Sequence, residues 1–309
     1  MDTALITGGA GFIGSHLVRA LLRRGDRVRV LDNFSTGKRE NLTGVEGSLE
    51  IFEGDLRDTD LLQEVAQGVD FVFHLAAFVS VPQSMVEPQL CYDVNVTGTL
   101  NLLEAARAAG VKQVVYASSA AVYGESQELP LRENTVSQTL SPYAAAKQAS
   151  EVFAGMYTHA FNLPVVALRF FNVYGPRQSH DSDYAAVVPI FIQRMLDGQP
   201  VTIYGDGHQE RDFVYVGEVV RAVLLAAEKP QAAGLVINVC SGETVSIMDL
   251  AKTLSGILSD VPAPQFAPPR AGDIYLSQGD PSRAEQVLGF RAQVSLAEGL
   301  AETVEWIQT

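Results

Sequence analysis

The sequence predicts an α/β protein built on a doubly wound parallel sheet, with a smaller α/β lobe in its C-terminal part. Short apolar runs rich in β-branched residues alternate with amphipathic helical stretches through the first half of the chain. A glycine-rich turn joins the first of these runs to the first helical stretch. After about Asn172 the alternation gives way to clusters of Gly, Pro and Asp, and this looser half supplies the lobe.

Each element follows from its hydrophobic period. Strands are expected at residues 4–7, 28–31, 49–53, 71–75, 114–118 and 165–169, and helices at residues 12–24, 59–66, 89–109 and 142–161. Residues 236–239 form another buried apolar run, so the chain is expected to return to the main sheet before it ends in the lobe. The main domain then contains residues 1–171 and about 213–240, and the lobe contains about 172–212 and 241–309.

The composition is that of a globular protein. Hydrophobic residues make up 47% of the chain and the mean hydropathy is +0.11. No apolar run reaches the roughly 18 residues that cross a bilayer, and the N-terminus runs into a predicted strand without the basic segment of a signal peptide. The two cysteines, Cys91 and Cys240, lie on different predicted elements and are expected to be buried spectators. We therefore expect a cytoplasmic protein.

The formal net charge of −14 bears on the choice of partners. Nucleic acids and anionic membranes need a basic surface, so neither is expected as a partner. An anionic small molecule must then be held by local arginines and by backbone N–H groups. No metal ion is expected.

A dinucleotide fingerprint follows the first predicted strand. The segment Gly8-Gly9-Ala10-Gly11-Phe12-Ile13-Gly14 leads directly into an amphipathic helix, which is the context that this motif requires. Glycines permit the tight turn and a close approach to a pyrophosphate, while the helix N-terminus presents free N–H groups to the anion. The sequence therefore predicts a Rossmann-type dinucleotide site.

Acidic residues end or follow the next two predicted strands, and the first of them favours NAD over NADP. Asp32 ends the second strand, where a carboxylate accepts hydrogen bonds from the adenosine ribose and repels the additional phosphate of NADP. Lys38 and Arg39 lie close by, either as a partial offset to that repulsion or as a solvated loop face. Asp55 follows the third strand and is expected at the adenine edge, with a cap on the following helix as the alternative.

The start of the helix at residues 142–161 carries a candidate acid/base pair. Ser141 is expected to cap this helix, and Tyr143 and Lys147 lie four residues apart on one face. Bringing a tyrosine pKa from about 10 toward neutrality requires about 4 kcal/mol of phenolate stabilisation, which a lysine ammonium, an oxidised nicotinamide and the helix dipole can supply. Taken alone, Tyr-x-x-x-Lys is typical of a solvated helix face. A complete dinucleotide site before it favours catalysis.

With these motifs in order, the chain resembles the extended short-chain dehydrogenase/reductase family, and within it the UDP-sugar 4-epimerases, over essentially its whole length. The resemblance rests on several motifs that agree in order and spacing: Gly8 to Gly14, Asp32-Asn33, Gly54-Asp55-Leu56, His74-Leu75-Ala76-Ala77, Asn95, Ser118-Ser119-Ala120-Ala121-Val122-Tyr123-Gly124, Tyr143 with Lys147, and Arg169-Phe170-Phe171-Asn172-Val173-Tyr174-Gly175-Pro176.

The resemblance implies a role for each matching residue. Ser119 hydrogen-bonds the reacting sugar hydroxyl, Tyr143 is the acid/base, and Lys147 lowers the pKa of the tyrosine and binds the nicotinamide ribose. The NAD-binding residues are expected to be Gly8, Gly11, Phe12, Ile13, Gly14, Asp32, Asn33, Asp55, Leu56, Leu75, Ala76, Ala77, Asn95, Tyr143 and Lys147. The UDP-sugar site is expected to contain Ser80, Ser119, Tyr143, Asn172, Val187, Tyr204, Arg211, Arg270, Asp273 and Ser277.

Other interpretations of these residues remain open on the sequence alone. Ser118 and Ser119 could cap a strand end, and Asn95 could tie loops together. Arg211 and Arg270, expected to clamp the diphosphate, could form surface salt bridges with Asp212 and Asp273. Ser277 could be an ordinary strand-end residue.

The two residues after Ser119 narrow the choice among the reactions of this family. Family members that eliminate water carry an aspartate and a glutamate there, whereas this chain carries Ala120 and Ala121, which can neither donate nor take a proton. A 4-epimerase with tightly held NAD is therefore expected. The alternatives are another nucleotide-sugar epimerase, such as a UDP-glucuronate 4-epimerase, a reductase, or a non-catalytic NAD-sensing binding protein.

Two further expectations come from the resemblance. Ser277 takes a position where a tyrosine would restrict the pocket, and Ser80-Val81-Pro82 resembles the members that accept N-acetylated sugars, so UDP-N-acetylglucosamine and UDP-glucose are both expected substrates. The helices at residues 89–109 and 142–161 form a dimer interface in similar enzymes, which implies a homodimer.

Overall fold

A computed structural model describes residues 1–126, 128–179, 186–269 and 274–309. Within these residues, one large parallel sheet has the strand order β11-β6-β5-β4-β1-β2-β3. The expected α/β class with a parallel sheet is confirmed. The strands of this sheet are β1 (Thr3–Thr7), β2 (Arg27–Asp32), β3 (Leu49–Glu53), β4 (Phe71–His74), β5 (Gln113–Ser119), β6 (Val165–Phe170) and β11 (Val236–Val239).

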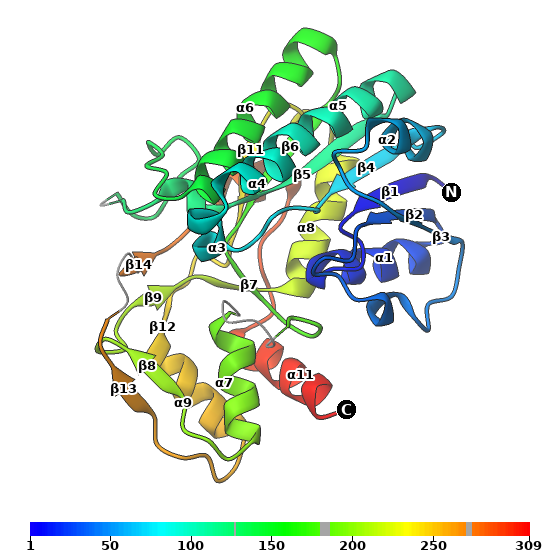
Figure 1. Cartoon of the computed structure of the whole chain (residues 1–309). Helices are drawn as coiled ribbons and strands as arrows, with labels where there is room; N and C mark the ends of the chain where they lie inside the picture. The colour runs from blue at the N-terminus through cyan, green and yellow to red at the C-terminus, as the bar shows by residue number, and fades with distance from the viewer. Residues whose placement is uncertain (127, 180–185, 270–273) are drawn as a thin grey trace.

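The strand order explains where a ligand can bind. The chain moves outward from β1 to β3, and then returns to place β4 on the opposite side of β1. Connections on the two sides of this reversal run to opposite faces, which opens a crevice at the carboxyl ends of β1 and β4. Helices α1 (Phe12–Arg24) and α8 (Val216–Glu228) cover one face, as Figure 1 shows. The other face is covered by α2 (Thr59–Ala66), α5 (Gly98–Ala109) and α6 (Pro142–Phe161).

Local signals account for the boundaries of the central helices. Helix α6 begins where the Ser141 hydroxyl accepts the Ala144 N–H at 3.1 Å, with Pro142 in its first turn. Helix α1 ends at Gly25, whose φ of 91° lets its N–H reach back to the last turn. The apolar stripes of these helices pack on a sheet whose central strands are buried on both sides, as in parallel sheets generally.

The C-terminal lobe has small sheets and its own core, and lies in the lower part of Figure 1. Its helices are α7 (Val187–Leu196), α9 (Ile247–Ile257) and α11 (Leu296–Gln308). Its paired strands are β8 (Thr202–Tyr204) with β13 (Gln265–Ala267), and β9 (Glu210–Arg211) between β12 (Val245–Ser246) and β14 (Leu276–Ser277). Strands β7 (Asn172–Tyr174) and β10 (Phe213–Tyr215) form a parallel pair at the junction. The residue boundaries of the two expected domains stay a prediction.

The expected helix at residues 89–109 is corrected. It consists of α4 (Pro88–Tyr92), a π-helical turn (Asp93–Thr97) and α5. The carbonyl oxygen of Asn95 accepts the hydroxyls of Thr99 and Ser150, and these side-chain bonds lie where the regular helical ladder is interrupted. Helix α3 (Val81–Val86) was not expected, because six residues are too few to show a helical period. The remaining short elements are η1 (Arg39–Leu42), η3 (Ala120–Tyr123), η4 (Pro230–Ala232) and α10 (Ser282–Leu288).

Several expected elements are confirmed. Helices α1, α2 and α6 and strands β3 and β11 have the expected bounds, and β11 pairs with β6, so the chain does return to the main sheet. Both cysteines are buried and free. In the described part of the chain, the helices are all too short or too polar to span a membrane.

Candidate active site

The glycine turn between β1 and α1 is packed at backbone distance. Gly8 has a φ of 73°, and a Cβ there would lie 2.7 Å from the backbone nitrogen of Ala76 after β4. A Cβ on Gly14 would lie 2.1 Å from the Gly8 carbonyl oxygen. Both separations are far below van der Waals contact, so the turn accepts only glycine at these positions.

The groups around this turn fit a dinucleotide. Helix α1 starts at Gly11 with no side-chain cap and no acidic residue in its first turn, so its first N–H groups face the crevice without a protein acceptor among the described residues. Asp32 lies 7% exposed at the end of β2, and its carboxylate accepts the N–H groups of Ala10 and Phe34, each at 2.9 Å. Free lone pairs remain on both oxygens for ribose hydroxyls. A pyrophosphate at α1 and a ribose at Asp32 match this donor and acceptor set.

Asp55 lies beside Asp32 at the same sheet edge. Its carboxylate accepts two bonds from the Arg57 guanidinium and one from Asn33, and chiefly the bonds from Arg57 lower its pKa to about 2. The alternative in which Asp55 caps α2 is wrong, because the Asp58 carboxylate accepts the Leu61 N–H and caps that helix. Asp55 and Asn33 are thus brought together as one exposed polar edge.

The basic residues near Asp32 are partly neutralised. Arg39 forms an ion pair with Glu53, and its guanidinium lies 4.0 Å from the centre of the Phe34 ring. A cation held by a carboxylate attracts a second anion less strongly. Arg39 therefore gives little support to binding of an additional ribose phosphate.

Asn95 ties together the loop after β4. Its amide oxygen accepts the Phe78 N–H at 2.7 Å, and its amide nitrogen donates to the Phe78 carbonyl at 3.0 Å. The side chain is 2% exposed. These bonds hold the residues directly after Leu75, Ala76 and Ala77, which is the structural role left open by the sequence.

Ser119, Tyr143 and Lys147 meet at the carboxyl edge of the sheet. The Ser119 hydroxyl lies near the Tyr143 phenol and acts to lower its pKa, and the Lys147 Nζ atom lies 5.8 Å from the centre of the Tyr143 ring. Lys147 also donates to the Ala117 carbonyl at 2.8 Å. The Ser119 oxygen accepts the Ala121 N–H at 3.1 Å, so this serine caps the short helix η3 that follows β5.

Burial changes the proton affinities of this group. Removal from water lowers the pKa of Lys147 to about 8, because an ammonium is poorly solvated there. Burial raises the pKa of Tyr143, and the hydrogen bond from Ser119 opposes that effect. The two pKa values therefore move apart, and a phenolate near neutral pH requires a further positive charge beside Tyr143, such as that of an oxidised nicotinamide.

The expected substrate residues are distributed over the lobe and its junction. Arg211 and Ser277 are brought side by side, as partners in the parallel pairing of β9 and β14. The Asn172 amide donates to the Asp212 carbonyl oxygen at 3.1 Å. The other described members are Ser80, which caps α3, Val187, the first residue of α7, and Tyr204, the last residue of β8. Arg270 and Asp273 lie outside the described residues.

Asp212 was not expected to be buried. Its side chain is fully inaccessible, and its carboxylate accepts the N–H groups of Ser241, Gly242 and Gly279 and the Ser241 hydroxyl. The alternative of a surface salt bridge with Arg211 is therefore wrong. Sequence reasoning missed this role because the donors come from segments far apart in the chain.

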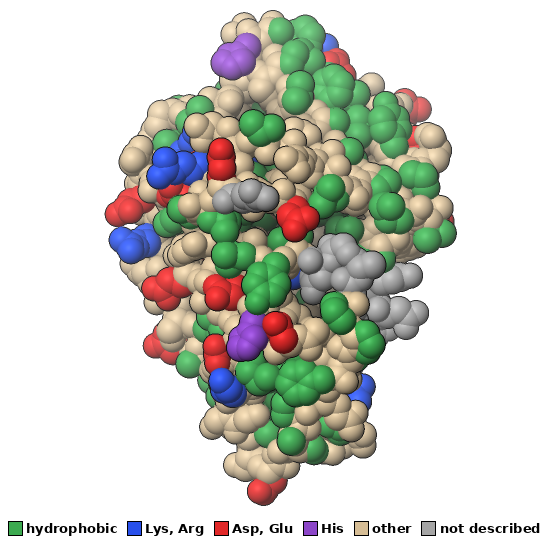
Figure 2. All heavy atoms as spheres, turned by 90° about the vertical axis from the view of Figure 1, so that its left-hand side faces the viewer, with side chains coloured by type: hydrophobic (Ala, Val, Ile, Leu, Met, Phe, Trp, Pro, Cys, Tyr) green, Lys and Arg blue, Asp and Glu red, His purple; other side chains and the backbone are tan. Residues whose placement is uncertain are grey.

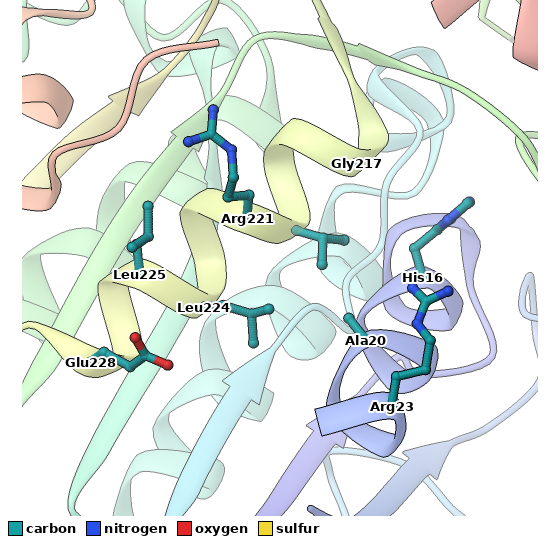
Figure 3. A pocket seen from close by; sticks show the side chains of 9 residues that line it. His16, Ala20, Arg23, Gly217, Arg221, Leu224, Leu225 and Glu228 are labelled. Carbon is teal, nitrogen blue, oxygen red and sulfur yellow. The ribbon is translucent and has the colours of Figure 1, made fainter. Parts of the chain in front are cut away.

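A separate groove lies between α1 and α8, as Figure 3 shows. Its volume is about 370 Å³, and its walls include His16 and Arg23 from α1 and Arg221 and Leu224 from α8. The His16 Nε2 atom hydrogen-bonds the Pro176 carbonyl at 2.8 Å, and burial lowers the pKa of His16 to about 4. The described lining contains none of the expected catalytic side chains, so the groove is not the reaction site.

Comparison with known proteins decides the family. The sequence profile of the NAD dependent epimerase/dehydratase family matches residues 4–240. The chain belongs to this family. It is an NAD-dependent enzyme, and the resemblance stated from its motifs is confirmed. Since the family includes both epimerases and dehydratases, membership alone leaves the reaction open.

Three relatives illustrate the similarity. UDP-glucose 4-epimerase of Mycolicibacterium smegmatis is 42% identical over 308 residues, which cover 98% of each chain. The structure of UDP-N-acetylglucosamine 4-epimerase from Methanobrevibacter ruminantium in complex with UDP-N-acetylmuramic acid is 41% identical, with a TM-score of 0.95 over 99% of this chain and 98% of the other. The NAD complex of Thermus thermophilus UDP-glucose 4-epimerase is 40% identical, with a TM-score of 0.89 over 99% of both chains.

We expect Gly14→Ala to abolish NAD binding, because its methyl group would displace the Gly8 carbonyl and widen the turn under the pyrophosphate. The measurement is the NAD released from the purified, denatured protein. Gly256→Ala in α9 is the matched control, since no described atom lies within 4 Å of the added methyl group. Full NAD content in Gly14→Ala would contradict the site.

Proposed function

We propose that this enzyme epimerises C4 of a UDP-hexose, interconverting UDP-N-acetylglucosamine with UDP-N-acetylgalactosamine and UDP-glucose with UDP-galactose. The observation that carries the proposal is the meeting of Ser119, Tyr143 and Lys147 beside the dinucleotide turn. The methyl side chains of Ala120 and Ala121 follow directly, so the acid and base needed for dehydration are lacking at these positions. The two related 4-epimerases with UDP-sugar names support the same reaction.

Each side chain has a distinct task in this reaction. Tyr143 takes the proton of the C4 hydroxyl and returns it after the 4-keto sugar has rotated to present its opposite face. The Lys147 ammonium stabilises the phenolate, and the dipole of α6 acts in the same direction because Tyr143 lies in its first turn. The Ser119 hydroxyl hydrogen-bonds the C4 oxygen as it changes between alcohol and ketone. When NAD is bound at the glycine turn, it would supply the acceptor for the C4 hydride and the source for its return, so no external oxidant would be needed.

We assign substrate binding to residues around the junction between the main domain and the C-terminal lobe. A net charge of −14 means that the diphosphate needs local cations, and Arg211 supplies a planar guanidinium suited to phosphate oxygens. Asn172, Ser80, Val187 and Tyr204 complete the described part of the proposed pocket. Arg270 and Asp273 remain predicted contacts.

We expect the purified protein to epimerise UDP-sugars without added cofactor. Incubation with UDP-glucose, UDP-N-acetylglucosamine and UDP-glucuronate, followed by separation of the products, tests the substrate. Tyr143→Phe should retain NAD and UDP-sugar binding but lose about 10²- to 10⁴-fold in rate, as general acid/base deletions do. Tyr92→Phe, at a ring that is 52% exposed, is the matched control. Dependence on added NADPH, or full turnover in Tyr143→Phe, would contradict the proposal.

Ser277→Tyr should abolish activity on the N-acetylated sugars while largely sparing UDP-glucose. A serine beside Arg211 leaves room for an acetamido group, and a tyrosine would fill that space. Rates on both sugar types measure the change. Ser48→Tyr, at an exposed position in the N-terminal part of the chain, is the control for replacing a serine by a tyrosine. Equal loss on both types would show that Ser277 does not select the sugar.

We also propose that the enzyme is a homodimer through α4 and α6. Large apolar side chains are exposed there, including Tyr92 on α4 and Val152 and Phe161 on α6, with exposed fractions of 52%, 69% and 47%. Hydrophobic side chains are also visible at the upper right of Figure 2. Exposed apolar patches of this kind are typical of protein interfaces.

Val152→Asp should convert the dimer to a monomer, because each protomer would bury an unpaired carboxylate in the apolar interface. Light scattering after size-exclusion chromatography gives the molar mass. Val136→Asp, at a loop residue that is 78% exposed, should remain dimeric. A monomeric wild-type protein would rule out the proposed interface.

A further inference from the structure

Three residues at four-residue spacing on α6 contact the last three residues of β5. The Tyr143 phenol lies near the Ser119 hydroxyl, Lys147 donates to the Ala117 carbonyl, and the Glu151 carboxylate accepts the Ser118 hydroxyl at 2.5 Å. The first two contacts belong to the catalytic group described above. Glu151 has no part in that chemistry, although it continues the same helix face toward the interior.

The Glu151 carboxylate is fully engaged. Arg169 on β6 donates to it twice, from Nε at 2.9 Å and from Nη2 at 2.7 Å, and the two side chains are 5% and 6% exposed. Strand β6 is the neighbour of β5, and Arg169 is the register partner of Ser118. The guanidinium also stacks over the Tyr123 ring at 4.6 Å and donates to the Glu133 carbonyl. The carboxylate therefore joins one helix to two adjacent strands.

Stability alone gives a weak reason for this ion pair. Removing two charges from water costs about as much as their attraction returns, so packed apolar side chains of similar volume are usually as stable or more so. An ion pair does provide directed hydrogen bonds, which apolar groups lack. The Glu151 carboxylate accepts three such bonds, one from Ser118 on β5 and two from Arg169 on β6.

We propose that Glu151 is a positioning residue, whose carboxylate, oriented by Arg169, fixes the register of α6 on β5 and so the approach of Tyr143 and Lys147 to Ser119. The proposal rests on the function proposed for those three residues. A small shift of α6 would change the separation between the phenol and the serine hydroxyl, while the lobe residues proposed to bind the diphosphate would stay in place.

The same carboxylate acts electrostatically on the catalytic pair. Glu151 lies one helical turn from Lys147, and its charge raises the pKa of that ammonium against the effect of burial. The other groups that face the pair are Cys91 from α4, Tyr116 from β5 and His74 from β4. Burial lowers the pKa of His74 to about 3 and raises that of Cys91, so both are neutral near pH 7. Replacing Glu151 by a neutral residue should therefore lower the pKa of Lys147. In the NAD-loaded enzyme, where the nicotinamide charge favours the phenolate, the same replacement should let Tyr143 lose its proton at lower pH.

The test is Glu151→Gln in the NAD-loaded enzyme. We expect kcat to fall about 10- to 100-fold, as for a small misplacement of catalytic groups, while KM and NAD content stay within about threefold. The titration of Tyr143 should move to lower pH by about half a unit or more. It is measured as the difference in ultraviolet absorbance between each protein and the same protein that also carries Tyr143→Phe. Glu104→Gln, at an exposed carboxylate on α5 that also accepts a tyrosine hydroxyl, should change neither quantity.

Two further variants separate geometry from charge. Ser118→Ala removes one bond and no charge, so it should lower kcat severalfold and leave the titration of Tyr143 unmoved; it also keeps the proposal testable if Glu151→Gln fails to fold. Glu151→Gln combined with Arg169→Gln removes both charges, so the titration should return toward that of the wild type while kcat remains low.

The proposal is wrong if Glu151→Gln lowers only the melting temperature and leaves kcat and the titration as in the wild type. It is also wrong if Ser118→Ala reproduces the full pH shift, since that variant changes no charge. The titration needs no substrate. A wild-type protein inactive on all UDP-sugars would therefore overturn the proposed function, while the shift in Glu151→Gln would still decide the electrostatic coupling.

Discussion

Backbone packing in the turn between β1 and α1 holds the site together. The Gly8 and Gly14 backbones lie so close to their neighbours that β1, α1 and the loop after β4 meet without side chains between them. This contact directs the free N–H groups of α1 into the crevice that the strand order opens. Strand β5 is the next neighbour of β4, so its last residues and the start of α6 reach the same crevice.

The electrostatics of the site depend on pairs of charges at short range. Arg39 is held by Glu53 and Arg169 by Glu151, so neither guanidinium is left to act on a distant anion. Lys147 differs, because in the described part of the chain its ammonium contacts a carbonyl oxygen and aromatic rings and makes no ion pair. It is the cation that remains available to a phenolate, in a protein whose net charge is −14.

The sequence predicted those features that local patterns determine. The bounds of α1, α2 and α6 follow from apolar periods, caps and glycines within the helices themselves, and the glycine turn follows from its place between strand and helix. The interruption at Asn95 escaped prediction, because the hydroxyl of Ser150 that contributes to it lies in another helix. The role of Asp55 was also left open, because the sequence does not show whether Asp55 or Asp58 caps α2. The structure assigns the cap to Asp58.

Pairings between distant segments lay beyond sequence reasoning. Arg211 and Ser277 were expected in one pocket through a family resemblance, and only the strand register places them side by side. Glu151 was not singled out from the sequence, although it lies four residues after Lys147 on the same helix. Its partners on β5 and β6 become visible only when the sheet is assembled.

The buried carboxylate of Asp212 has a consequence for how such an enzyme can change. Four hydrogen bonds fasten the segments at residues 241–242 and 279 to the strand that carries Arg211. Removing one donor would leave part of this buried carboxylate without a hydrogen bond, so insertions in these segments are expected to destabilise the fold. Ser277 lies on the strand that ends just before Gly279 and takes no part in these bonds. New sugar preferences are therefore expected to arise by exchange of single side chains within a rigid frame, and the loops that build the frame should keep their lengths.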